Sequence, residues 1–149
     1  MNRDQAEEFL KRQRQAILAT IRADGRPQLS NVLSAYDEGK LLVSITETRA
    51  KFRNLQRDPR ATILVLGANF WEYLVVDGQA TMVGLPEAQP LLRRYYELAA
   101  GQPHPNWDEY DQSMRDERRV LLTISVDHMY PLAGEAAGGS EGAGSGRLL

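Results

Sequence analysis

Residues 17–45 read ILATIRADGRPQLSNVLSAYDEGKLLVSI, and this stretch decides the predicted fold. It contains three β-prone runs, which cover residues 17–21, 28–36 and 41–45. An Asp-Gly turn at 23–26 joins the first two runs, and Asp-Gly between two such runs is a strong hairpin signal. A second turn at 37–40 leads into the third run. Three strands joined by tight turns predict an antiparallel meander.

The rest of the chain alternates between helical and strand patterns. Further strands are expected at 61–66, 73–83 and 120–126, and helices at 3–14, 49–57, 87–100 and 107–115. We expect Glu47-Thr48 to cap the second helix, Asp58-Pro59 to end it, and Gly101 to end the third. Six strands with few short helices predict a mainly β chain. Its architecture is expected to be a closed or nearly closed antiparallel barrel with peripheral helices.

Length and composition limit the classes of protein to which the chain can belong. The 149 residues are about one domain long. We expect a barrel domain at 1–133 and a flexible tail at 134–149, which is mostly Gly, Ala, Ser and Glu. The charged N-terminus, the lack of a long apolar run and the absence of cysteine predict a cytoplasmic protein without membrane spans or disulfides. The net charge of -2 gives no reason to expect nucleic acid or membrane as a partner.

Other kinds of site find little support in the sequence. The two histidines, His104 and His128, form no convincing metal site without additional carboxylates, and each is expected to be structural or exposed. No Gly-x-Ser-x-Gly sequence is present, which argues against a hydrolase of that type. No residue is identified as a proton donor or as another catalytic group.

The most informative charge pattern is local. Five cations stand against one carboxylate, Asp58, between residues 49 and 60: Arg49, Lys51, Arg53, Arg57 and Arg60. The predicted helix here follows a strand directly, so its free N–H groups and the positive end of its dipole meet these cations at one corner. Guanidinium and ammonium groups at a helix N-terminus predict a phosphate site. A solvated basic face is the alternative interpretation.

The second strand carries an unusual set of polar residues. Alternation places Gln28 and Ser30 on one face and Leu29 and Asn31 on the other. Such polar groups are poor core material unless they have hydrogen-bond partners. They are therefore either exposed on an edge strand or hydrogen-bonded to a polar heterocycle that lies against the strand.

Six stretches occur in order along the chain: ILATI (17–21), DGRPQLSNV (24–32), RAKFRNL (49–55), DPRA (58–61), WDEY (107–110) and RRVLLTI (118–124). The first four resemble the opening and the phosphate-holding stretch of pyridoxamine 5′-phosphate oxidase-like proteins. With the last two, the pattern looks closest to the actinobacterial F420-dependent reductases, the flavin/deazaflavin oxidoreductase B group. The resemblance covers about residues 10–132.

The resemblance implies a split β-barrel of the FMN-binding type that forms a homodimer, with a cofactor in each of two interface grooves. It implies ring contacts from Ser30, Asn31 and Val32, a lining strand edge at Ile45 and Thr46, and a phosphate held by Arg49, Ala50 and Lys51. Further candidates are Arg53, Asn54, Arg57 and, across the dimer, Trp71 and Tyr73. For the two aromatic residues, ordinary interface or barrel packing is the alternative.

The function implied by the resemblance is hydride transfer between coenzyme F420 and a small unsaturated substrate, such as an enone, a quinone-like ring or a tetrapyrrole. An FMN-dependent oxidase or reductase and a non-enzymatic carrier of F420 or flavin remain as alternatives. The surplus of cations favours F420, whose oligoglutamate tail extends beyond its phosphate. Pyridoxamine phosphate is not expected as the substrate, because the C-terminal Arg- and His-containing substrate segment of true pyridoxamine phosphate oxidases is not reproduced.

Overall fold

The structure is a computed structural model that describes residues 1–132. Its helices are α1 (Arg3–Arg12), α2 (Ala50–Arg57), α3 (Gln89–Ala100) and α4 (Trp107–Asp116). Its strands are β1 (Gln15–Ile21), β2 (Pro27–Leu33), β3 (Ala35–Asp37), β4 (Lys40–Thr46), β5 (Arg60–Leu66), β6 (Tyr73–Val83), β7 (Arg119–Ser125) and β8 (His128–Tyr130). The predicted tail at 134–149, and the domain boundary that precedes it, lie outside the described residues.

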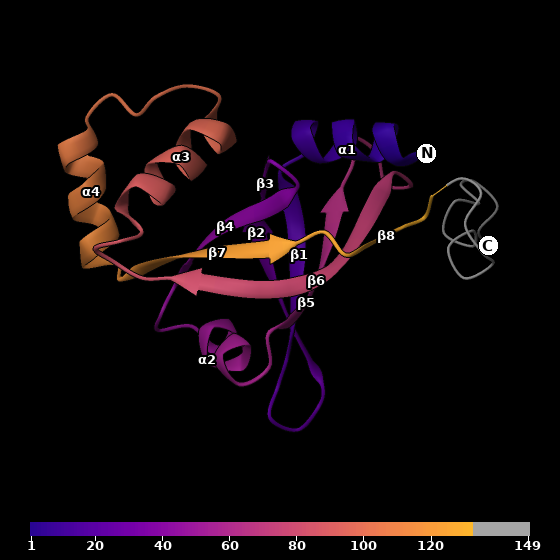
Figure 1. Ribbon diagram of the computed structural model, residues 1–149, viewed down its shortest axis with the longest axis horizontal. Helices are drawn as coiled ribbons and strands as arrows, with labels where there is room; N and C mark the ends of the chain where they lie inside the picture. The colour runs from indigo at the N-terminus through magenta and orange to yellow at the C-terminus, as the bar shows by residue number, and fades with distance from the viewer. Residues whose placement is uncertain (133–149) are drawn as a thin grey trace.

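The strands form one mainly antiparallel sheet in the order β2-β1-β5-β6-β7-β4-β3, and β8 pairs with β6 (Figure 1). This confirms the predicted mainly β fold of the split-barrel type. The prediction of a closed or nearly closed barrel is corrected, because the sheet is open. Strand β2 pairs only with β1, and β3 pairs only with the first three residues of β4. The two ends of the sheet are therefore not joined by a hydrogen-bonded ladder.

The structure has two strands more than the six that the sequence predicts. The run at 28–36 is one strand in the prediction, but it breaks at Ser34, whose N–H donates to the Arg14 carbonyl at 2.7 Å. The predicted three-strand meander is therefore wrong, because β2 pairs with β1 and β3 pairs with β4 at opposite ends of the sheet. The other addition, β8, is a three-residue strand on β6. Strand β6 is eleven residues long and pairs with β5, β7 and β8 along its length. A three-residue strand such as β8 leaves little periodic signal in a sequence.

The turns agree with the sequence, and the helix ends lie within two residues of the expected positions: α3 begins at Gln89 instead of residue 87, and α4 ends at Asp116 instead of residue 115. Gly25 and Gly101 have φ values of 87° and 78°, as the predicted hairpin turn and the predicted end of α3 require. Helix α1 ends at Arg12, two residues before its expected end. The predicted cap of α2 is wrong: the capping residue is Arg49, without a side-chain cap bond. Within residues 1–132, no helix has the length and apolar character needed to cross a membrane.

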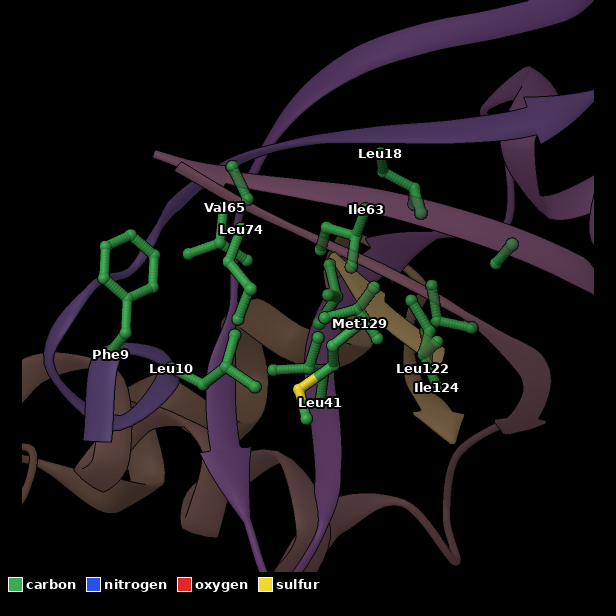
Figure 2. Packing of buried hydrophobic residues seen from close by; sticks show 14 of the residues in the cluster. Phe9, Leu10, Leu18, Leu41, Ile63, Val65, Leu74, Leu122, Ile124 and Met129 are labelled. Atoms are coloured by element: carbon green, nitrogen blue, oxygen red, sulfur yellow. The ribbon is translucent and has the colours of Figure 1, made fainter. Parts of the chain in front are cut away.

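The inward face of the sheet and one side of α1 form the main core, with Phe9, Leu10, Leu18 and Ile63 among its fully buried members (Figure 2). Strands β4 and β7 are also covered on their other face. There Leu42 and Leu121 pack against Leu92 and Tyr110 of the α3–α4 pair. The two helices lie together on one side of the molecule, and α2 lies apart from them (Figure 1). Strand β3, at one end of the sheet, contacts α1 and α3.

Candidate functional site

A cavity with a volume of about 820 Å³ lies between two free strand edges. Residues 30–33 of β2 form one wall, and residues 44–46 of β4 contribute to another. Strand β2 has no partner on its outer side, and residues 43–46 pair with β7 but not with β3. Free strand edges present backbone N–H and C=O groups that can bind a polar ligand. The cavity therefore lies where the sheet stays open, which the prediction of a closed barrel missed.

The cavity collects most of the residues that the sequence and the resemblance single out. Seven of them line it: Ser30, Asn31, Val32, Ile45, Thr46, Arg49 and Lys51. The lining does not include Ala50, Arg53, Asn54, Arg57 or Trp71. The structure thus joins the predicted ring-binding strand to the first turn of the basic helix. Cofactor contacts for all twelve residues stay predictions.

Three cations lie near one another in the lining of this cavity. Arg49 and Lys51 come from the start of α2, and Arg119 comes from the start of β7. The ammonium group of Lys51 donates to Ser30 Oγ at 3.2 Å and forms no salt bridge with any described residue. Burial, followed by the charges of Arg49 and Arg119, lowers the pKa of Lys51. A bound anion would remove this repulsion, so the residues fit a phosphate group.

The start of α2 adds backbone donors to the cationic end. The first N–H groups of a helix have no partner within the helix, and the side chain of Arg49 does not cap them. Only three residues separate the end of β4 from the start of α2, so the N-terminus of the helix lies near the strand edge at Thr46. The positive end of the helix dipole and the three cationic side chains therefore all favour the binding of an anion in this part of the cavity.

Arg119 was not among the sequence candidates, although it lies in the stretch RRVLLTI. Its position depends on a contact between distant turns. Arg118 adopts a positive φ of 54°, and its carbonyl accepts a hydrogen bond from the N–H of Glu47 at 3.1 Å. Arg119 then donates to the Ser44 carbonyl at 3.3 Å and pairs with Glu117 at 2.8 Å. Only the pairing of β4 with β7 brings this residue to the basic helix.

Asn54 and Arg57 do not line the cavity but belong to a hydrogen-bond network between α2 and the sheet. The Asn54 amide donates to Thr20 Oγ1 at 3.1 Å, and Thr20 donates to Gln28 at 3.0 Å. Arg57 donates to the Asn54 side-chain oxygen and to the Ile21 carbonyl, each at 2.9 Å. This network ties α2 to β1 and β2. It also gives Gln28 the partner that a polar residue on the inner side of β2 needs.

Aromatic residues form the other end of the cavity, and the sequence reasoning did not select them as site residues. They are Tyr95 and Tyr96 of α3 and Tyr110 of α4, accompanied by Met114. Tyr95 donates to the Leu33 carbonyl at 2.8 Å, so it links α3 to the free edge of β2. Burial raises the pKa of Tyr95, offset in part by a hydrogen bond from the Ser44 backbone and by the charge of Arg119, which therefore lies near these tyrosines as well as near Lys51. In the sequence, the adjacent tyrosines of the predicted helix look like core aromatics, so no local signal marks them as site residues.

Trp71 lies in the turn between β5 and β6, next to the exposed Phe70, and the two rings meet edge to face with centroids 4.7 Å apart. The indole is 38% exposed. Tyr73, the first residue of β6, is partly buried. A contribution of Trp71 across a dimer stays a prediction.

Comparison with known proteins shows that the chain shares its fold with solved structures. Solved structures similar to the chain include a conserved hypothetical protein from Mycobacterium tuberculosis, with 25% identity, a TM-score of 0.70, and coverage of 87% of this chain and 82% of that chain. An F420 reductase has 25% identity and a TM-score of 0.63, over 83% of this chain and 94% of its own. A FAD-binding protein from Mesorhizobium loti, at 18% identity, shares the fold with a TM-score of 0.63, over 87% and 92% of the two chains.

The family model described as pyridoxamine 5'-phosphate oxidase matches residues 3–133, which include every residue of the cavity lining. The match extends from α1 through β8 and so covers the whole described sheet. The chain therefore belongs to the pyridoxamine 5'-phosphate oxidase family.

Proposed function

We propose that this protein is an oxidoreductase that binds coenzyme F420 in the cavity between β2 and β4 and reduces a small unsaturated acceptor. The observation that carries the proposal is the cluster of Arg49, Lys51 and Arg119 in the lining of that cavity. Lys51 has no acidic partner among residues 1–132, and its pKa is lowered. A partly buried cationic group of this kind is stabilised by a bound anion.

The chain's own groups divide the work of binding. Arg49, Lys51 and Arg119, with the N-terminus of α2, bind the phosphate. The edge of β2 at Ser30, Asn31 and Val32 orients a ring through hydrogen bonds and packing. When bound, the reduced cofactor would supply a hydride for an electron-poor double bond. Solvent, which reaches the open cavity, supplies the proton that completes the reduction.

Two observations favour F420 over FMN. The F420 reductase is similar over most of both chains at 25% identity. Arg53 is exposed one turn beyond Arg49 and adds positive charge outside the cavity, where a polyanionic tail would extend. FMN remains the second candidate, because the same cluster satisfies a single phosphate and the matched family is the pyridoxamine 5'-phosphate oxidase family. A non-enzymatic carrier of either cofactor is the third.

We further propose that the protein acts as a homodimer in which a second copy covers the outer side of β2. Leu29 and Leu33 are 62% and 51% exposed on this edge strand, and an uncovered apolar edge favours association. Leu33 also lines the cavity, so the second copy would complete its wall. Sedimentation equilibrium at micromolar concentration should give the mass of two chains, and a monomer would contradict the proposal.

Equilibrium binding of F420 and of FMN to the purified cofactor-free protein tests the main proposal. Fluorescence is measured at low and at physiological salt. We expect tighter binding of F420, weakened by salt because screening reduces the attraction of exposed cations for the tail. Tighter binding of FMN would move the chemistry to the flavin alternative. Binding without turnover of enone or quinone acceptors would favour a carrier, and binding of neither cofactor would contradict both oxidoreductase proposals.

A further inference from the structure

The two ends of the cavity differ in charge. One end carries Arg49 and Lys51, and the aromatic end presents the uncharged side chains of Tyr95, Tyr96, Tyr110 and Met114, while the charge of Arg119 acts on Lys51 as well as on Tyr95 and Tyr110. An anion gains most at the first end, whereas a planar uncharged molecule gains most against aromatic rings. The volume of about 820 Å³ is near the upper part of the usual range for a ligand pocket. One cavity therefore offers two chemically distinct subsites.

The three tyrosines at the aromatic end differ in what their hydroxyl groups do. Tyr95 donates to the Leu33 carbonyl, and Tyr110 donates to the Leu92 carbonyl, each at 2.8 Å. Both hydroxyls are thus occupied by the backbone. The hydroxyl of Tyr96 forms no hydrogen bond with any part of the chain that the structure describes. It is the free donor among the three.

The ring of Tyr96 is nevertheless held in place. It meets Tyr110 edge to face at a centroid distance of 5.2 Å, His104 at 5.0 Å and Trp107 at 6.0 Å. These contacts come from α4 and the loop before it, and they use the ring rather than the hydroxyl. The ring of Tyr96 is therefore fixed while its hydroxyl has no partner among the described residues, and a positioned group loses little entropy on binding a ligand.

We propose that the aromatic end is the subsite for the hydride acceptor. The acceptor would be a planar, uncharged carbonyl compound that packs on the aromatic side chains and accepts a hydrogen bond from Tyr96. This inference rests on the proposed function, since it places the acceptor beside a cofactor held at the cationic end. Tyr96 acts here as a specificity residue: a carbonyl oxygen can accept its hydrogen bond, and a hydrocarbon of the same shape cannot.

The test uses the full chain loaded with oxidised cofactor, so that no turnover occurs. Menadione is the carbonyl probe, and 2-methylnaphthalene is the matched probe without carbonyl groups. Calorimetry measures both affinities for the wild type, for Tyr96→Phe and for the control Tyr36→Phe. Tyr36 donates to Glu7 outside the cavity, so its variant removes a tyrosine hydroxyl without touching the site. Thermal unfolding checks that both variants fold.

We expect Tyr96→Phe to weaken menadione binding roughly two- to tenfold, the usual effect of one hydrogen bond. Affinity for 2-methylnaphthalene and for the cofactor should stay unchanged, and the control should bind like the wild type. In turnover with menadione, KM should rise more than kcat falls. Equal loss for both probes, unchanged menadione affinity or a loss of cofactor affinity would overturn the subsite.

A measurement on the wild type alone tests the same inference. Menadione and the cofactor should bind together, and mutual displacement would overturn the two-subsite arrangement. Failure of the wild type to bind F420 or FMN would overturn the proposed function and this inference with it. Normal cofactor binding with no role for Tyr96 would overturn this inference alone.

Discussion

The polar residues at the start of helix α2 and those in its second half differ in their hydrogen-bond partners. Asn54 and Arg57, in its second half, are bonded to Thr20 and to the Ile21 carbonyl and fasten the helix to β1. Arg49 and Lys51, at its start, face the cavity, where Lys51 has only the Ser30 hydroxyl as a partner. One short basic segment therefore contains both a structural network and a cluster of cations without a matching anion.

The difference shows which cations of a basic segment are available to a ligand. A guanidinium that already donates to fixed acceptors gains little from an added anion, because it must give up bonds that it has. A partly buried ammonium next to two other cations gains much more, because the anion removes a repulsion that the fold maintains. Lys51 and Arg57 carry the same charge. Only their hydrogen-bond partners in the structure show that Lys51 is the more available of the two to a ligand.

The largest expected effect comes from removing the central cation of the cavity. Lys51→Met should weaken cofactor binding by about 1.5–3 kcal/mol, roughly 10- to 150-fold, as expected for a hydrogen bond between charged groups. Fluorescence titration with F420 and with FMN measures it. Arg60→Met is the matched control, since this cation of the same segment is paired with Asp58 at 2.7 Å and lies outside the cavity. Equal losses in the two variants would show that only the net charge of the segment matters.

A second variant addresses the structural half of the helix. Asn54→Ala should lower the free energy of unfolding by about 1–2 kcal/mol, because it removes a buried amide that bonds Thr20 and accepts from Arg57. Urea denaturation measures the change, and Gln56→Ala, at an exposed position of the same helix, should change it little. Cofactor affinity of the folded Asn54→Ala protein should fall less than twofold. A loss as large as that of Lys51→Met would assign Asn54 to the binding site.

The smallest effect concerns pH. The pKa of Lys51 is lowered from 10.5 in the ligand-free fold, so the folded protein holds this proton less tightly than the unfolded chain. The resulting destabilisation is complete below the lowered pKa and disappears as the pH rises towards 10.5. Lys51→Met lacks it and should be the more stable protein at pH 7, by less than about 1 kcal/mol because solvent screens a partly exposed charge. In urea denaturation at rising pH, this advantage should shrink, and a constant difference would contradict it.

Much of the fold was readable from local sequence. The Asp-Gly turn at 23–26, the end of α3 at Gly101 and the long strand at 73–83 all depend on residues that are neighbours in the chain. The sequence-based prediction was wrong where contacts between distant residues determine the structure. The break at Ser34 depends on a hydrogen bond to Arg14, and the cap of α2 depends on how the turn after β4 meets Arg118.

The candidate site divides in the same way. The polar run in β2 and the basic start of α2 were visible in the sequence, and the structure places them in one cavity. Arg119 and the tyrosines of the aromatic end were not selected, because nothing in their own neighbourhood distinguishes them from an ordinary surface arginine or from core aromatics. Their part in the site follows from the strand pairing and from the packing of α3 on α4.

The sequence by itself determined the mainly β class, the hairpins and a positively charged helix N-terminus, because turn chemistry, side-chain periodicity and local charge are properties of adjacent residues. Only the tertiary structure decided that the sheet stays open, that a cavity lies between its free edges, and that Lys51 faces Arg119 without an acidic partner. Lys51 and Arg119, for example, come from segments that are about 70 residues apart in the chain. The free energy of bringing such segments together depends on packing and hydrogen bonds across the whole sheet, which no local pattern contains.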